Sequence, residues 1–356
     1  MIEQILPIDY LKSALSVSTF VGCPLNCKYC IVGEISEKKA KRISSPEKII
    51  TQLLDHSFFI KNITPLMINN KTDPLLPQVK EDTFKILKLL QKYDLKNPRI
   101  LITKMELSPK DLQFLEGLNK SVFILVSYSN LKFPIEIGNF KSQKLTLETL
   151  KKRKKVKALH YWRPLMKGLN DSEESILEIF NLIKNSCEGS IISGIRLTED
   201  IKYKMESYGA NFTGWNGDKD HKYLSWEIIE KIVNIRNEKF PNYPLYRHTS
   251  CGLNATSNLP DWGFNFLKGK RHCLKDCKNN LNCKLKIPKR DKVEDLLIKI
   301  NLNPLLLYFK KDHIFLNEEI SQDQRAFLLH SLRYPIKAKK INKSFSEKLL
   351  LGKNDE

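Results

Sequence analysis

The stretch Ser18-Thr-Phe-Val-Gly-Cys23-Pro-Leu-Asn-Cys27-Lys-Tyr-Cys30 places three cysteines at C-x3-C-x2-C spacing, with an aromatic residue before the third. A tight loop with this spacing can direct three thiolates at one site, and thiolates suit iron–sulfur clusters, Zn or Cu(I). A structural zinc site needs four closed ligands, and no fourth Cys or His follows near Cys30. The spacing therefore favours an iron–sulfur cluster with one iron left open, and a structural zinc loop is the alternative.

The net charge, the apolar runs and the cysteine count indicate which class of partner and which compartment to expect. Its 356 residues include 60 Lys and Arg against 40 Asp and Glu, a net charge of +20, and the basic residues are mostly lysine. This charge favours a polyanionic partner such as DNA or RNA, and a lysine-rich background composition is the alternative explanation. No apolar run approaches the roughly 20 residues of a membrane span, and the N-terminus lacks a signal-peptide layout. We expect a cytoplasmic protein whose eight cysteines bind metals rather than form disulfides.

Apolar runs and helix-start signals alternate along the first two thirds of the chain. Six runs predict strands, at 15–21, 65–69, 99–103, 121–128, 158–165 and 190–197. Helices are expected between them, beginning near Ser45, Thr83, Ser108, Leu145 and Asp171, with a last one from Trp226. This alternation indicates parallel strands with right-handed crossovers. The predicted fold class is α/β, a partial (β/α)6 TIM-type barrel over residues 1–245.

Polar residues gather where these predicted strands end. In barrels of parallel strands, the chemistry lies at the carboxyl ends of the strands. The residues at or just past those ends are the candidate binding residues, namely Asn69, Asn70, Thr72, Asp73, Lys104, Ser127, Ser129 and Arg196. An Asx-rich turn before Pro74 and ordinary exposed polar residues are the alternative interpretation of the same pattern.

Three further segments carry a resemblance to a known family. They are the turn after the second strand, Asn70-Lys-Thr-Asp-Pro-Leu-Leu-Pro77, the third-strand segment 102–115, and the fifth-strand segment Arg163-Pro-Leu-Met-Lys-Gly-Leu-Asn-Asp171. With the cysteine motif, they resemble the radical S-adenosylmethionine (SAM) superfamily, in its spore photoproduct lyase and DNA repair photolyase-like branch. The resemblance covers about residues 16–200. After the fourth strand, where that branch usually has Glu-Pro and Arg, this chain has Phe133-Pro-Ile-Glu-Ile137 and Lys144.

The resemblance implies a cofactor set and a type of reaction. The three-cysteine motif would hold a [4Fe–4S] cluster whose open iron chelates SAM. An electron donor such as flavodoxin or ferredoxin would allow cleavage of SAM to a 5′-deoxyadenosyl radical, which abstracts hydrogen from the substrate. The strand-end residues would contact SAM, with Lys104 near its carboxylate and Ser127 and Ser129 near its ribose. No catalytic residue is singled out, and the candidates near the radical are Tyr128, Tyr161, Arg163 and Arg196.

A second group of cysteines and a change of composition mark the last third of the chain. Residues 246–290 form an expected cysteine-rich region in which Cys251, Cys273, Cys277 and Cys283 close a second [4Fe–4S] cluster or a zinc site. Cys187 is expected to be a buried free thiol. Residues 291–340 predict a small mixed α+β extension, with a hairpin and a helix from Ser321 to Leu332, as a lid over the barrel or a winged-helix-like module. Residues 341–356 are expected to be a disordered tail.

The sequence leaves the substrate open. The charge and the photolyase-like segments favour lesion repair or base modification of a nucleic acid. The second cysteine group favours radical modification of a peptide or small metabolite. A non-enzymatic, metal-dependent nucleic-acid-binding protein is the third alternative, and the pattern predicts no oligomeric state.

Overall fold

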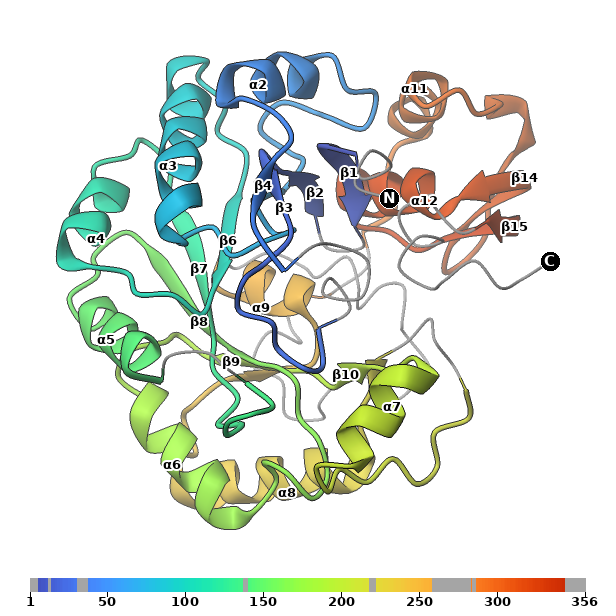
Figure 1. Cartoon of the computed structure of the whole chain (residues 1–356). Coiled ribbons are helices and arrows are strands. Elements are labelled where there is room, and N and C mark those ends of the chain that lie inside the picture. Colours follow the sequence, from blue (N-terminus) through green and yellow to red (C-terminus); the bar gives the residue numbers. More distant parts are fainter. Residues whose placement is uncertain are drawn as a thin grey trace.

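The fold is organised by one large sheet that curves around the interior of the molecule (Figure 1). The computed structural model describes residues 6–11, 14–30, 38–136, 140–217, 222–257, 283 and 286–342. The sheet has the strand order β1-β2-β5-β6-β7-β8-β9-β12. Its parallel strands are β2 (Ala14–Val17), β5 (Leu66–Ile68), β6 (Arg99–Thr103), β7 (Val122–Ser127), β8 (Lys157–Trp162), β9 (Ser190–Ile192) and β12 (Leu245–Tyr246).

The predicted partial TIM-type barrel is confirmed, with two additions at its edges. The strand β1 (Ile8–Leu11) pairs antiparallel with β2, and the two-residue strand β12 pairs in parallel with β9. Both are too short for their side-chain periodicity to show in the sequence. Two of the predicted strands are interrupted, so that each forms two shorter strands. Residues 15–21 form β2 and β3 (Phe20–Val21), and residues 190–197 form β9 and β10 (Ile195–Arg196).

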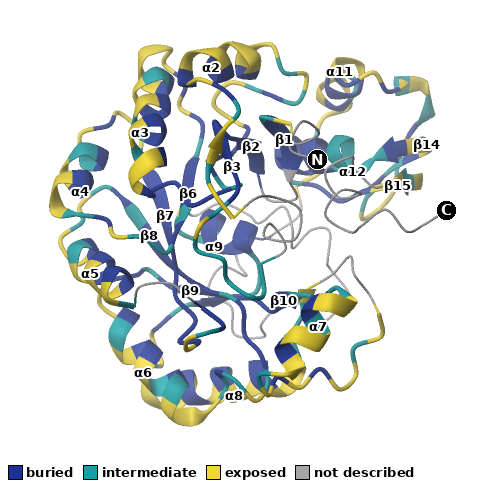
Figure 2. Ribbon diagram, in the orientation of Figure 1, coloured by how far each residue is buried: buried dark blue, intermediate teal, exposed yellow. Residues whose placement is uncertain are grey.

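A ring of helices covers the outer face of the sheet (Figure 1). It contains α2 (Pro46–Leu54), α3 (Pro77–Lys92), α4 (Pro109–Glu116), α5 (Phe140–Leu150), α6 (Glu173–Ile183) and α8 (Trp226–Lys239). Ser45 and Ser108 cap α2 and α4 as predicted, each accepting a hydrogen bond from a first-turn backbone N–H. Figure 2 shows these helices buried on the side facing the sheet and exposed on the other.

Three predicted helix boundaries were wrong. Helix α3 begins at Pro77 rather than Thr83, because a proline at the first helical position needs no N–H partner. Helix α6 is capped by Ser172, which accepts from Ser175 N–H, whereas Asp171 accepts from Gly168 N–H in the preceding turn. Helix α5 spans Phe140–Leu150, so the basic run 151–155 lies beyond its end.

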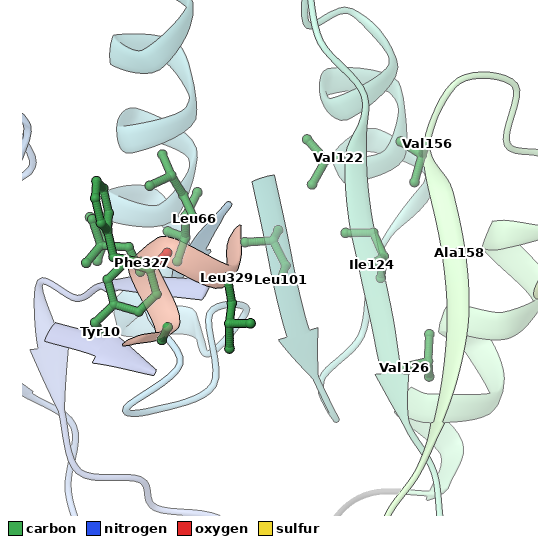
Figure 3. Close-up of a cluster of buried hydrophobic side chains, with 14 of the residues drawn as sticks. Tyr10, Leu66, Leu101, Val122, Ile124, Val126, Val156, Ala158, Phe327 and Leu329 are labelled. Carbon is green, nitrogen blue, oxygen red and sulfur yellow. The ribbon is translucent and has the colours of Figure 1, made fainter. Parts of the chain in front are cut away.

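The apolar core has two layers, one on each face of the sheet. On the outer face, Leu66, Leu101, Ile124 and Ala158 from neighbouring strands are all buried (Figure 3). On the inner face, buried residues of the seven parallel strands pack with the short helix α9 (Thr249–Ala255), which lies inside the curve of the sheet (Figure 1). At Gly252 of α9, an added Cβ would lie 2.6 Å from Cγ1 of Ile191. A glycine at this position therefore lets α9 approach the inner face of β9.

The C-terminal extension is a separate three-stranded sheet with two helices. It comprises α11 (Arg290–Lys299), a 3-10 turn (Pro304–Leu306), β13 (Leu307–Phe309), β14 (Ile314–Ser321), α12 (Gln322–Leu332) and β15 (Ile336–Asn342). The predicted hairpin and the capped helix from Ser321 are confirmed. Residues 341 and 342, placed in the predicted tail, belong to β15, which pairs in parallel with β14. The remaining predicted tail, 343–356, lies outside the described residues.

The extension packs against the first strand of the barrel. The Tyr10 hydroxyl of β1 is hydrogen-bonded to Nδ1 of His330 in α12, and the rings of Phe58 and Phe327 lie 5.7 Å apart (Figure 3). This apolar contact makes α12 part of the outer core layer. Within the described parts of the chain, no helix has the length and hydropathy that crossing a bilayer requires.

Candidate functional site

The three-cysteine loop follows β3 and is held by backbone hydrogen bonds at the carboxyl ends of the strands. Strand β3 pairs antiparallel with β4 (Lys41–Arg42). Inside the loop, Cys30 N–H donates to Cys27 O at 3.0 Å. Lys28 N–H donates to Ile135 O at 2.9 Å, which ties the motif to the segment after β7. All three thiols are half-buried, so the loop presents them at a partly enclosed site.

The environment of the thiols disfavours their ionisation when no metal is bound. Burial raises the pKa of Cys23 to about 11 and that of Cys27 to about 12, and the charge of Cys30 adds to both shifts. The three side chains are therefore close enough to affect one another. The Thr72 hydroxyl oxygen is buried without a hydrogen bond of ordinary geometry among the described residues, although its contact with Cys23 lowers the pKa of that thiol slightly. The Thr72 hydroxyl therefore has hydrogen-bonding capacity that fits a ligand at the site.

The number of thiols bears on the kind of metal group that the loop could hold. A structural zinc site needs four closed ligands, whereas three cysteines can hold a cluster that leaves one iron open. The loop supplies three half-buried thiols, and no fourth Cys or His follows near Cys30. This donor set fits a cluster with one open iron.

A buried carboxylate, Glu136, lies beside the cysteine loop and organises the polar groups around it. Its Oε1 accepts from Lys104 Nζ at 2.5 Å. Its Oε2 accepts from the Tyr29 hydroxyl and from the Ser129 hydroxyl, each at 2.8 Å. Gln143 Nε2 donates to Oε1 at 3.2 Å. The network joins the cysteine loop to the ends of β6 and β7, and the Glu136 side chain is only 1% exposed.

The Lys104–Glu136 pair is ionised. Burial alone would raise the pKa of Glu136, but the Lys104 ammonium and the hydrogen bonds from Tyr29 and Ser129 together hold that pKa below its ordinary value. Burial alone would lower the pKa of Lys104, and Glu136 outweighs it and raises that pKa. Lys104 also lies 5.6 Å from the centroid of the Tyr29 ring. The pair therefore places a fixed cation and a fixed anion within reach of the Cys27 thiol, whose ionisation both of them influence.

Two predicted binding residues are fully engaged in joining neighbouring strands. Asp73 accepts from Thr103 Oγ1 at 2.8 Å and from Lys104 N–H at 2.6 Å, which links the ends of β5 and β6. Asn69 Oδ1 accepts from Thr19 N–H at 2.8 Å, and its Nδ2 donates to Thr83 Oγ1 at 2.9 Å. These bonds account for the buried polar atoms of both residues, so a contact with SAM stays a prediction for them.

The other predicted binding residues lie along the same rim. Asn70 Oδ1 accepts from Ser16 Oγ at 2.6 Å. The Ser127 carbonyl accepts from Gln143 Nε2 at 2.9 Å. Arg196 lies apart from these residues, in β10, where it pairs across the strands with Lys222 of β11 (Lys222–Tyr223). The rim thus splits into a part around Glu136 and a second part around β8, β10 and β11.

The second part of the rim is a cluster of cations around a buried tyrosine. Arg163 Nη1 donates to the Tyr161 hydroxyl at 3.1 Å, and that hydroxyl also lies 3.2 Å from Thr249 Oγ1 of α9. Burial would raise the pKa of Tyr161, but Lys222 and Arg163 bring it down to about 7. Desolvation and the Arg163 charge lower the pKa of Lys222 to about 8, although the residue as a whole is exposed. The cluster is suited to an anionic group.

The second cysteine group is only partly described. Cys251 lies in α9, where His248 N–H donates to its Sγ at 3.1 Å, and both Cys251 and Cys283 are 8% exposed. Cys273 and Cys277 lie outside the described residues, so the four-cysteine site stays a prediction. Cys187 is 5% exposed in the outer core, as expected of a buried thiol, and burial raises its pKa to about 12.

Several residues of the site were not identified from the sequence. Glu136 lies in the segment after β7, Gln143 in α5 and Lys222 in β11, and none of them stands at a predicted strand end. The signal for Glu136 was present, because an acidic residue stands after the fourth strand in Phe133-Pro-Ile-Glu-Ile137. Nothing in the local sequence of Lys222 distinguishes it from the many exposed lysines.

Comparison with curated proteins gives one relative by sequence. No family model matches the chain. Over 209 residues, the chain is 23% identical to a Prochlorococcus marinus protein named "Probable dual-specificity RNA methyltransferase RlmN". The match covers 53% of this chain and 57% of that protein, so the chain spans just over half the length of its curated relative.

Several solved structures have folds that match about two thirds of the chain. A radical SAM methyltransferase from Sphaerobacter thermophilus has a TM-score of 0.49 at 14% identity and covers 69% of this chain and 70% of its own. A spore photoproduct lyase has a TM-score of 0.49 at 14% identity, with 68% and 79% covered. SuiB of Streptococcus suis, bound to its precursor peptide SuiA, has a TM-score of 0.45 at 13% identity, with 69% and 52% covered. These structural likenesses, at 14% identity or less, concern the fold alone.

Proposed function

We propose that this protein is a radical SAM enzyme whose cluster is bound by Cys23, Cys27 and Cys30. The observation that carries the proposal is the position of the cysteine loop, at the carboxyl ends of parallel strands and beside the buried Glu136 network. Barrels of parallel strands place their reactive groups at that end. The partly enclosed thiols and the buried Thr72 hydroxyl beside Cys23 fit a cluster with a ligand on its open side.

The cofactors supply the chemistry, and the chain supplies position and shielding. When bound, the [4Fe–4S] cluster and SAM provide a one-electron cleavage of the C5′–S bond of SAM, which yields a 5′-deoxyadenosyl radical that abstracts hydrogen from the substrate. In this chain, Tyr29 packs the end of the cysteine loop against Glu136. Lys104 provides a fixed cation beside Cys27 and is available to a carboxylate at the site.

The substrate we favour carries an anionic group, as a nucleic acid does. Arg163 and Lys222 face the Tyr161 hydroxyl at the rim, and Arg163 also interacts with the charge of Cys30. A phosphate held by these cations would lie across the rim from the cysteine loop. The net charge of +20 supports the same class of substrate. A peptide or a small metabolite is the second candidate, and its carboxylate would use the same cations.

The test of the enzymatic proposal is SAM cleavage. The protein is reconstituted anaerobically with iron and sulfide, reduced, and analysed for 5′-deoxyadenosine. Cys27→Ala is expected to remove both the visible absorption of the cluster and the product. Cys187→Ala is the matched control, because Cys187 is buried in the outer core away from the loop. An intact cluster without 5′-deoxyadenosine would contradict the proposal and leave the non-enzymatic alternative.

We further propose a second metal group on Cys251, Cys273, Cys277 and Cys283, in a cysteine-rich segment between the barrel and the C-terminal extension. Its support is the number of thiols in that part of the sequence. Iron and sulfide are counted in a variant that lacks Cys23, Cys27 and Cys30. Iron that remains would support a second cluster, whereas zinc without iron would support a structural zinc site.

A further inference from the structure

The outer face of the C-terminal sheet carries a row of side chains that the barrel does not use. Tyr308 of β13 is paired with Phe315 of β14, and Phe315 is paired with Lys337 of β15. The neighbouring residues Leu307, Ile314, Leu316 and Ile336 are buried on the other face. Because side chains alternate along a strand, Tyr308, Phe315 and Lys337 all point outward, away from the core.

The two rings of this row form one aromatic surface. Their centroids lie 6.5 Å apart with an interplanar angle of 44°. Tyr308 is 44% exposed, and Phe315 is half-buried. The rings line an open hollow of about 590 Å³ together with Lys310, Lys311, Asp312, His313 and Asn317. Single exposed apolar residues are common, whereas here two paired rings border one open hollow.

Cations surround the rings. Lys310 Nζ lies 6.0 Å from the centroid of the Tyr308 ring, and Lys311 belongs to the same turn of the hairpin. Lys337 and Lys339 are exposed two residues apart on β15, so they share its outer face. The hollow is therefore bordered by positive charge on the side of the turn and on the side of β15.

The nearby carboxylates already have partners. Asp312 accepts from His313 Nδ1 at 2.7 Å. Glu318 accepts from Asn303 N–H at 3.1 Å, and Glu319 lies 3.7 Å from Lys340 Nζ. These contacts do not cancel the carboxylate charges, but the lysines of this region outnumber its three carboxylates, so the net charge around the rings is positive; these lysines are Lys310, Lys311, Lys337, Lys339 and Lys340.

We propose that this face, defined as Tyr308, Phe315, Lys310, Lys311 and Lys337, binds single-stranded nucleic acid. Aromatic rings on an open sheet stack on bases of any sequence, and lysines beside them contact the phosphates. A duplex hides its base faces and cannot stack in this way, so a single strand is the occupant that uses both the rings and the charges. Binding at this face is independent of the proposed reaction, because it requires neither the cluster nor SAM.

The test measures binding of the full chain to a fluorescein-labelled oligothymidylate of about 12 nucleotides, which spans a typical stacking surface. Anisotropy is measured without SAM or reductant, so a failure of SAM cleavage does not affect it. Tyr308→Leu and Phe315→Leu keep apolar bulk and remove a stacking ring. Each is expected to raise the Kd by about 5- to 150-fold, the range seen when one stacked base is lost.

The matched control is Tyr203→Leu. Tyr203 is 67% exposed on α7 (Glu199–Glu206) and has Lys202 Nζ 5.1 Å from its ring, so it combines an exposed ring and a lysine elsewhere on the molecule. It is expected to leave the Kd unchanged. Lys337→Gln is expected to reduce the slope of log K against log salt by about 0.7, the value for one phosphate contact on a single strand.

Several outcomes would overturn the proposal. Unchanged affinity in both leucine variants, with folding confirmed by circular dichroism, would show that the rings do not stack on the strand. If Tyr203→Leu lost as much affinity as the Tyr308→Leu and Phe315→Leu variants, binding would not depend on the proposed face. Equal or tighter binding of a duplex of the same length, or equal competition by polyglutamate, would show that the face does not select exposed bases. Comparing the Kd of an oligoribonucleotide of the same length shows whether the face prefers RNA or DNA.

Discussion

Lys104 Nζ lies 2.5 Å from Glu136 Oε1, and both side chains are almost fully enclosed, 12% and 1% exposed. This ion pair joins the end of β6 to the loop that follows β7, directly beside the cysteine motif. Replacing Glu136 with Gln would leave the ammonium of Lys104 enclosed without its counter-ion. Removing one partner of a buried pair costs about 3–5 kcal/mol of unfolding free energy. Urea unfolding of Glu136→Gln should therefore show a large fall in the midpoint.

A second Glu–Lys ion pair, which is exposed at the surface, serves as the control for the buried pair. Glu47 and Lys85 lie 2.6 Å apart, but their side chains are 55% and 51% exposed. Solvent screens an exposed pair of this kind, so Glu47→Gln should leave the urea midpoint close to that of the wild type. Equal effects of the two substitutions would contradict a special role for burial at Glu136.

The same ion pair predicts how stability depends on pH. The folded-state pKa of Glu136 lies below its ordinary value of 4.5, so the folded state binds a proton there less readily than the unfolded state. The stability from Glu136 is thus fully present above pH 4.5 and is lost as pH falls through the folded-state pKa. Unfolding free energies measured from pH 7 to pH 3 should fall more steeply for the wild type than for Glu136→Gln. If the unfolding free energies of the two proteins changed equally with pH, the lowered pKa of Glu136 would be contradicted.

Much of this architecture could be predicted from the sequence, because strand and helix patterns are local. Val122–Ser127 is buried along its whole length, as a central parallel strand must be. The cysteine motif is equally local, since three ligands fall within eight residues. Boundaries failed where one local signal competed with another, as at Asp171 and Ser172, which can both cap a helix.

Which residues are partners of Glu136 could not be predicted, because they come from separate loops and from α5. Tyr29 precedes Glu136 by 107 residues and Lys104 precedes it by 32. Their proximity depends on the order of the strands in the sheet, and this order cannot be derived from a single sequence. The same holds for Lys222, whose effect on Tyr161 arises only because β11 pairs with β10. Asn69 shows that a polar residue at a strand end can also serve the fold, because its side chain bonds Thr19 and Thr83.

Tyr161 should titrate near neutral pH. Lys222 and Arg163 lower its pKa to about 7 from an ordinary 10.0, so a phenolate should form in the folded protein between pH 6 and 8. The ultraviolet absorbance of phenolate reports this ionisation, and Tyr161→Phe should remove the transition. Because the folded-state pKa is depressed, the resulting stability grows as pH rises from about 7 towards 10. Lys222→Met should move the transition upward. A wild-type protein without a phenolate signal below pH 9 would contradict this prediction.

Gly194→Ala should disturb the cation cluster from a distance. An added Cβ at Gly194 would lie 1.7 Å from the Tyr223 carbonyl oxygen, so β11 would have to move away from β10. Lys222 would move with β11, and the pKa of Tyr161 should rise towards its ordinary value. Overpacking of this kind costs about 1–3 kcal/mol. Gly117→Ala is the control, because its nearest contact is an ordinary 3.4 Å. An unchanged tyrosine transition in Gly194→Ala would show that Lys222 keeps its position.

Metal binding should release protons from the cysteine loop. Burial raises the pKa of Cys23 to about 11 and of Cys27 to about 12, so both thiols are protonated at neutral pH without a metal. Thiolates are the reactive and metal-binding form, and a metal must displace these protons. The metal-free protein should therefore be alkylated slowly at pH 7, with a rate that rises at high pH. Anaerobic cluster assembly in weak buffer should acidify the solution, and less so for Cys27→Ala. Rapid alkylation of Cys23 and Cys27 at pH 7, at the rate of an exposed cysteine, would show that the loop already holds thiolates and that their burial does not control their ionisation.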